Sequence, residues 1–332
     1  MSGGLGLIPA AMLVFAVAAL LLSFLGGVLY APIRRLLREL PPAAEAELLL
    51  AFAGAPALAG LSLVVLALAP SLTHLIGIGI DHCHEHGHHI HFCLIHSDLW
   101  TNSAMDWLVL LLAGLAVVAF AGDLPQRLWR AHGVARTLEA IALPTPAPRS
   151  WRVVDMDSPL ALTAGLIRPR IYLSKRLLDD LSPAELAAVV GHEQAHRRRR
   201  DAVRQLVAEV LARLHLPPIR RRLLADLSLA SERACDEEAA LSGNGRLGVA
   251  GTILKVARLN AAHQRPSDAL LPTLTGADLE ARIQALLRPA AERQVPPWSL
   301  LIPGAGVILA FGCLYSDRLH HDVESALHLL IS

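Results

Sequence analysis

The sequence predicts a mainly α membrane protein, with four transmembrane helices and a soluble α+β region between the third and the fourth. Two observations carry this prediction: the composition, and four long runs without charged residues. Hydrophobic residues make up 54% of the 332 residues, mean hydropathy is +0.46 and aromatic residues are only 4%, which suits lipid-facing helices. The formal net charge of +1 gives no indication of a direct nucleic-acid partner.

The four runs without Asp, Glu, Lys or Arg are each about long enough to cross a bilayer. They extend from the N-terminus to Ile33, from Leu48 to Pro70, between Asp106 and Asp123, and over 295–316. The first has no preceding basic residue and no clear cleavage site, so we expect a retained anchor. Buried helices of a soluble protein are the alternative, which four such runs in one chain disfavour.

Basic residues in the short loops indicate the orientation in a bacterial cytoplasmic (inner) membrane. Arginines follow the first and third runs, whereas 70–104 contains neither Lys nor Arg. We therefore predict three transmembrane helices in 1–123 with an extracytoplasmic N-terminus, a cytoplasmic domain over 124–294, and a fourth transmembrane helix with a short extracytoplasmic tail over 295–332. The arginines that set this orientation are Arg34, Arg35, Arg38, Arg127, Arg130 and Arg136.

The cytoplasmic region is predicted to be mostly helical with a small sheet. Alternating β-branched and apolar residues between Trp151 and Ser174 indicate two or three short strands. Ser182, Pro183 and Glu185 match a capping box that opens a helix. Further helices are expected over 124–142, 223–241, 246–262 and 277–288.

The helix that follows Ser182 contains the sequence HEQAH at 192–196. Residues four apart share one face of a helix, so His192 and His196 can bind one metal ion. Glu193 is rotated off that face, where its carboxylate can act as a base on a water beside the metal. The chain has 16 histidines, so two surface histidines on a polar helix are the alternative interpretation.

A second predicted helix carries the sequence SERACDEEA at 231–239. Glu232, 36 residues after His196, is the expected third ligand, and Asp236 is expected to orient a ligand imidazole. Glu237 and Glu238 are rival ligands by residue type, and a solvated acidic helix face is the alternative for them. Three protein ligands with an open position for water would form a catalytic rather than a structural site.

The segments GHEQAHRRRRD, SERACDEEA and TAGLIRPRIYLS together resemble the membrane metallopeptidases of the BlaR/MecR type, over roughly residues 100–290. The resemblance implies a gluzincin-like zinc metalloprotease domain, with His192, His196 and Glu232 as ligands. It implies Glu193 as the general base and Asp236 as the residue behind the ligands. It further implies that an edge strand within 160–166 binds the substrate main chain by β-addition. The residues of that strand are Leu162, Thr163, Ala164 and Gly165.

The resemblance also implies a function: a zinc metalloendopeptidase in signal transduction that cleaves a cytoplasmic protein, expected to be a transcriptional repressor or a similar regulator. The best-known members of the family carry a penicillin-binding sensor domain after their last span. This chain ends 16 residues after Ser316, so we expect no such sensor and leave the input signal open. An inactive scaffold that keeps its metal is disfavoured, because a scaffold needs ligands but no base.

A second candidate metal site lies in the predicted extracytoplasmic loop at 81–96, DHCHEHGHHIHFCLIH. Neutral imidazoles suit zinc, copper or nickel, so the alternative function is a metal sensor or metal-homeostasis protein that acts through this loop. Cys83 and Cys93 are expected to bind metal or to form a disulfide, and a polar loop without metal is the remaining interpretation. The candidate ligands are His82, His84, His86, His88, His89 and His91.

Two further features are assigned to structure rather than chemistry. The arginine run at 197–200 indicates a solvated helix end near anionic membrane lipid, in preference to a nucleic-acid site. Cys235 is expected to be a small buried hydrophobic residue, with a redox-sensitive site residue as the alternative. Neither the substrate nor the oligomeric state follows from the sequence.

Overall fold

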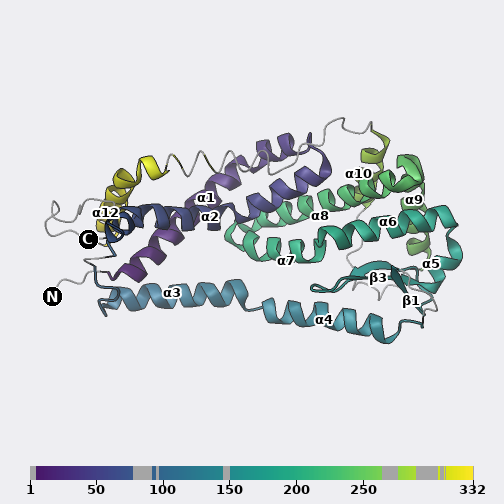
Figure 1. The fold of residues 1–332 in the computed structure, drawn as a ribbon, viewed down its shortest axis with the longest axis horizontal. Coiled ribbons are helices and arrows are strands. Elements are labelled where there is room, and N and C mark those ends of the chain that lie inside the picture. Colours follow the sequence, from purple (N-terminus) through teal and green to yellow (C-terminus); the bar gives the residue numbers. More distant parts are fainter. Residues whose placement is uncertain are drawn as a thin grey trace.

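The computed structural model describes residues 5–77, 92–94, 97–144, 150–263, 276–288, 306, 310 and 312–331. The candidate ligands of the histidine-rich loop lie outside the described residues, as does most of the predicted fourth span. The described chain is mainly helical with one small sheet. Figure 1 shows an elongated molecule, with α1, α2, α3 and α12 at one end and the sheet with α5, α6 and α9 at the other.

Three helices have the length and apolar composition of membrane spans: α1 (Leu7–Leu37), α2 (Pro42–Leu75) and α3 (Ala104–Ala121), the last continuing into α4 (Leu124–Ala140). Large apolar side chains cover their outer faces, as lipid contact requires. The prediction of a mainly α membrane protein is confirmed. Exposed examples are Leu20, Phe24, Val28, Leu61, Leu111 and Val118.

The first two spans pack closely where Gly60 of α2 meets Phe15 of α1. A Cβ atom at position 60 would lie 2.8 Å from the Phe15 ring and 2.9 Å from its carbonyl oxygen. Only a residue without a side chain fits this contact, so Gly60 allows the two backbones to approach. The third span is tied to the start of α1, because the main-chain N–H of Gly6 donates to Asp106 at 2.9 Å.

The tail that the sequence analysis treated only as short forms a helix, α12 (Ser316–Ile331), which packs against α2. Its buried His320 lies with Nδ1 2.9 Å from the carbonyl oxygen of Ala67. Its buried Glu324 accepts a hydrogen bond from the main-chain N–H of Phe92 at 2.8 Å. The amphipathic spacing of this segment was present in the sequence, but its packing partners lie more than 200 residues away.

The soluble region contains three strands and six further helices among the described residues. The helix that carries HEQAH begins with the predicted capping box: Ser182 Oγ accepts from the Glu185 N–H, and the Glu185 carboxylate accepts from the Ser182 N–H. Helix α8 starts six residues before the predicted helix, and α7 was not predicted. The elements are β1 (Trp151–Val154), β2 (Ala161–Ala164), β3 (Arg170–Ser174), α5 (Lys175–Asp180), α6 (Pro183–Arg199), α7 (Asp201–Leu211), α8 (Pro217–Ala239), α9 (Gly245–His263) and α10 (Gly276–Leu287).

The strands form a sheet in the order β1-β3-β2, in which β3 runs parallel to β1 and antiparallel to β2. Ile171 and Leu173 of β3 face α6 and pack with Val189 and Val190, whereas Tyr172 on the other face packs with Leu138 of α4. The sheet is therefore held between α4 and α6. Within the described sheet, β2 is an edge strand on the side of the HEQAH helix.

The soluble region rests directly on the membrane hairpin. Tyr30, Leu49 and Ala53 of α1 and α2 share one buried cluster with Leu223 and Leu227 of α8. Ion pairs surround this cluster, so burial and charge together join the two parts. The pairs are Glu45 with Arg233 at 2.9 Å, Glu47 with Arg204, and Asp226 with Arg34.

Candidate active site

The HEQAH residues lie in the last two turns of α6, on the side that meets α8. His192 and His196 are one turn apart and present their rings side by side, with ring centroids 4.7 Å apart. Gly191 allows the two helices to approach, because a Cβ there would lie 3.0 Å from Ser242 Oγ and 3.5 Å from the Cα of Ala239. The glycine before the motif thus brings the histidines within reach of the second helix.

Glu232 of α8 lies opposite both imidazoles. Its Oε2 is 3.5 Å from His192 Nε2, its Oε1 is 3.4 Å from His196 Nε2, and the two Nε2 atoms are 3.0 Å apart. The structure therefore brings together the three residues that the sequence analysis singled out as ligands, and these three residues form a group that could hold a metal ion.

The outer nitrogens of both rings are held by carboxylates. His192 Nδ1 lies 2.9 Å from Asp236 Oδ1, and His196 Nδ1 lies 2.8 Å from Asp201 Oδ2. Each carboxylate accepts from an Nδ1–H, which leaves a lone pair on each neutral Nε2. Two lone pairs 3.0 Å apart repel each other unless a cation lies between them. The arrangement fits a metal ion bound by both Nε2 atoms and Glu232.

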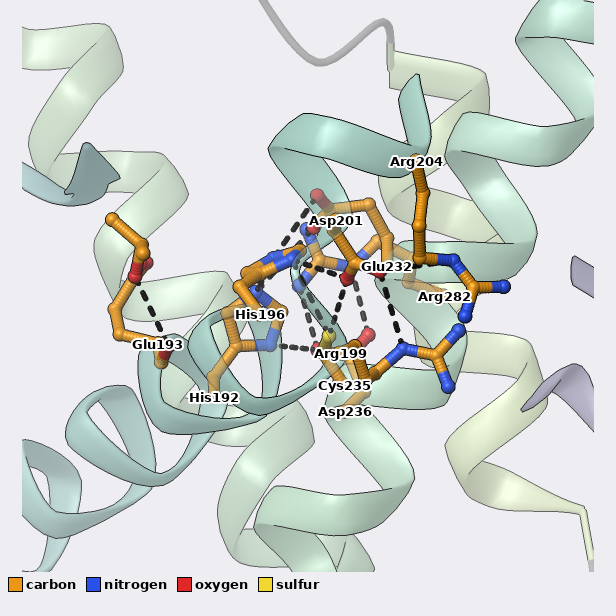
Figure 2. A network of polar contacts seen from close by, with 11 residues as sticks. His192, Glu193, His196, Arg199, Asp201, Arg204, Glu232, Cys235, Asp236 and Arg282 are labelled. Atoms are coloured by element: carbon orange, nitrogen blue, oxygen red, sulfur yellow. Dashed lines mark hydrogen bonds and ion pairs between the residues drawn. The ribbon is translucent and has the colours of Figure 1, made fainter. Parts of the chain in front are cut away.

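Asp201 was not identified from the sequence. It comes directly after Arg200, which ends α6 in the left-handed conformation with φ 54°, so the chain turns back and α7 starts with Asp201 beside His196. A non-glycine residue in this conformation costs about 1–2 kcal/mol, which the surrounding contacts must offset. Figure 2 shows Asp201 above the His196 ring. An acidic residue that closes an arginine run was the available signal.

Arg282 of α10 was also missed, because no motif connects it to the histidines. Its guanidinium donates two hydrogen bonds to Asp236, at 2.7 and 2.8 Å, and lies 2.9 Å from Glu232 Oε2. Arg282 is 5% exposed and Asp236 is 1% exposed. A buried, bidentate pair of this kind orients both carboxylates and offsets part of their charge.

The carboxyl groups around the histidines are ionised at neutral pH. Burial favours their neutral forms, but hydrogen bonds to the histidines outweigh it for each one. The pKa of Glu232 therefore lies well below its usual value, and the pKa values of Asp236 and Asp201 are also lowered. Ionised carboxylates are the forms that a metal ligand and its hydrogen-bonded partners require.

Cys235 lies behind the site without taking part in the ligand set. Its sulfur is 3.4 Å from both His196 Nδ1 and Asp201 Oδ2, and its side chain is fully buried. Burial raises the pKa of this thiol to about 11, so the sulfur keeps its proton at neutral pH. A protonated thiol that contacts the occupied nitrogen of His196 is a packed neighbour and not a competing ligand.

Glu193 is positioned by the edge strand. The Thr163 hydroxyl of β2 donates to Glu193 Oε2 at 2.7 Å and lies 3.0 Å from the Glu193 carbonyl oxygen. In Figure 2 Glu193 lies on the opposite side of the histidine rings from Glu232. The carboxylate is therefore separate from the ligand set, as a base requires.

A cleft of about 500 Å³ opens over these residues. One wall is the predicted edge strand, of which Leu162, Thr163 and Gly165 line the cleft, while the side chain of Ala164 is buried. The other wall consists of apolar residues of α9, including Ile253 and Val256. A cleft with an edge strand on one side and apolar side chains on the other has the form of a peptide-binding groove.

The rival ligands lie elsewhere. Glu237 is 3.5 Å from Arg246, and Glu238 pairs with Arg198 at 2.6 Å. Both carboxylates are therefore occupied by arginines on other faces of α8.

The family model described as BlaR1 peptidase M56 matches residues 99–286, more than half of the chain. The chain belongs to this family. It is therefore a membrane metallopeptidase of the M56 type, which the sequence resemblance had predicted. The matched range extends from just before α3 to α10 and contains every residue of the site described above. Neither the curated proteins nor the solved structures contain a significant match.

Replacing Asp201 with asparagine is expected to weaken metal binding to this M56 site by about tenfold to a hundredfold, because the amide loses the charge that orients His196 and raises its basicity. Competition with a chromophoric chelator, with zinc as the probe ion, measures the affinity. Asp180→Asn is the matched control, since Asp180 pairs with Arg176 on the distant α5. Equal affinities for the Asp201 and Asp180 variants would show that Asp201 does not support the ligand.

Proposed function

We propose that the chain is a zinc endopeptidase that hydrolyses a cytoplasmic regulatory protein, and the paired Nε2 atoms opposite Glu232 carry this proposal. Zinc with bonds of about 2.0–2.1 Å in tetrahedral geometry places its ligand atoms about 3.3 Å apart. The three separations here are 3.0, 3.4 and 3.5 Å. Two nitrogens and one oxygen also form the ligand set of many zinc peptidases and leave one position open.

The residues of the chain account for the rest of peptide hydrolysis. Zinc, when bound, supplies the Lewis acidity that makes water nucleophilic near neutral pH. Glu193 accepts the proton from the attacking water and passes it to the leaving amine. Thr163 holds Glu193 in place through the 2.7 Å hydrogen bond, and Asp236 and Asp201 keep both imidazoles in the tautomer that binds metal.

The substrate is proposed to bind as an added strand along β2. This strand has a hydrogen-bonded neighbour on one side only within the described sheet, and it lines the cleft beside Glu193. Main-chain pairing with Leu162, Thr163, Ala164 and Gly165 would hold a scissile peptide in extended form, with little dependence on its side chains. An exposed, extended segment of a repressor or a similar regulator meets this requirement.

Metal removal tests the chemistry directly. Purified protein in detergent is expected to cleave an unstructured protein, to lose this activity completely with a zinc chelator, and to regain it when zinc is returned. The products, sequenced by mass spectrometry, should include internal cuts, as an endopeptidase produces. Activity that persists after verified loss of metal, or release of terminal residues alone, would contradict the proposal.

The orientation is a separate prediction. A reporter fused at Glu85 is expected to be extracytoplasmic, and one fused at Gln264 cytoplasmic, because the arginine-rich loops favour the cytoplasmic side. Paired alkaline phosphatase and fluorescent-protein fusions measure both positions. The reverse pattern would place the site outside the cell and exclude a cytoplasmic substrate.

A further inference from the structure

A second cavity, of about 740 Å³, lies at the end of α3 where the chain meets α7 and α8. Its wall on the α3 side is formed by Val118, Ala119 and Phe120. Four arginines and two carboxylates line the remainder: Arg127, Arg213, Arg220, Arg221, Asp123 and Glu209. The cavity is separate from the peptidase cleft, with which it shares no lining residue.

Two of the arginines are already occupied within the protein. Arg213 donates to the carbonyl oxygens of Ala119 and Phe120 and pairs with Asp123, which satisfies the end of α3. Arg127 pairs with Asp123 at 2.8 Å and with Glu209. Both carboxylates of the cavity are thereby used.

Arg220 and Arg221 are different. Among the residues that the structure describes, neither guanidinium has a hydrogen-bond or ion-pair partner. Two unpaired guanidiniums in one cavity carry a charge of +2 that the lining does not offset, and guanidinium binds phosphate in a bidentate manner. They lie in the first turns of α8, whose N-terminal dipole also favours an anion.

The depth of the cavity matches the edge of a bilayer. A Cβ at Gly27 of α1 would lie 3.5 Å from Ile219 and 3.7 Å from Leu216, so the start of α8 lies beside Gly27. Twenty residues separate Leu7, where α1 begins, from Gly27, which corresponds to about 30 Å of helix, the thickness of the hydrocarbon core. The exposed apolar surface of α3 ends at Val118, which is 69% exposed. Apolar residues thus lie on the bilayer side and the arginines at headgroup level.

We propose that this cavity binds the phosphate of an anionic glycerophospholipid, with Arg220 and Arg221 as its ligands and the end of α3 in contact with the acyl chains. The site joins α3 to α7 and α8, so a bound lipid bridges a membrane helix and the two helices that follow the HEQAH motif. Basic pockets beside membrane helices bind such headgroups.

Lipid binding to the full chain tests the proposal. Native mass spectrometry from a phosphatidylglycerol–phosphatidylcholine mixture is expected to show preferential retention of phosphatidylglycerol. An arginine near the membrane surface contributes about fivefold in affinity, so Arg220→Gln with Arg221→Gln should weaken retention by roughly thirtyfold. Arg222→Gln is the matched control, because Arg222 is exposed on the same helix but does not line the cavity. It should retain the lipid within about threefold.

A second measurement does not depend on folding of the variants. Photoactivatable phosphatidylglycerol is expected to label peptides from 118–127 or 219–224 in the unmodified protein. Labelling confined to other segments would overturn the proposal. An equal loss for Arg222→Gln would indicate diffuse surface charge, and full displacement of the lipid by millimolar inorganic phosphate would indicate a free-anion pocket. Either result would also overturn it.

Discussion

Replacing Glu193 with glutamine is expected to abolish detectable peptide cleavage while the protein keeps its metal and its fold. The amide cannot accept a proton from water, and loss of a general base lowers a rate by about a hundredfold to ten-thousandfold. The geometry should persist, because the Thr163 hydroxyl, 2.7 Å from Glu193 Oε2, can donate to the amide oxygen as well. Single-turnover cleavage and metal content, measured on the same preparation, separate chemistry from binding.

Glu238→Gln is the matched control for this variant. It makes the same chemical change on α8, where Glu238 pairs with Arg198 at the surface and does not line the cleft. Its activity should equal that of the parent. A Glu193 variant with metal bound and activity within about tenfold of the parent would remove Glu193 from the role of base.

Replacing Glu232 with glutamine is expected to remove the metal and, with it, all activity. Changes behind a metal ligand cost about tenfold to a hundredfold in affinity, so loss of a charged ligand should cost more than about a hundredfold. The stabilisation that metal provides, about 2.7 kcal/mol at a hundred times the dissociation constant, should disappear as well. Metal content after dialysis and melting temperature with and without zinc measure both effects.

The metal-free fold of this variant should survive, because Arg282 keeps its two hydrogen bonds to Asp236 at 2.7 and 2.8 Å. Glu237→Gln, five residues further along α8 and paired with Arg246, is the matched control and should bind metal normally. If the Glu232 variant keeps full metal and activity, the ligand assignment is wrong, and Glu237 or Glu238 becomes the next candidate.

Features that depend on local spacing were predictable from the sequence. The helical repeat alone places His192 and His196 on one face, and the hydropathy of the runs alone identifies the spans that the structure describes. The capping box at Ser182 is likewise a contact between residues three apart. Each of these patterns acts within one helix, so no knowledge of packing is needed to interpret it.

Other features depend on how separate elements pack. Residue type made Glu232 a candidate, but only the crossing of α6 and α8 brings its carboxylate within 3.5 Å of both histidines. Asp201 faces His196 because Arg200 adopts a left-handed conformation, and Arg282 reaches the site from 46 residues beyond Asp236. The arginine cavity also needs the end of α3 beside the start of α8. Sequence periodicity determines which face of a helix is polar or apolar, but the partner of that face is selected by the free energy of burying all the elements together.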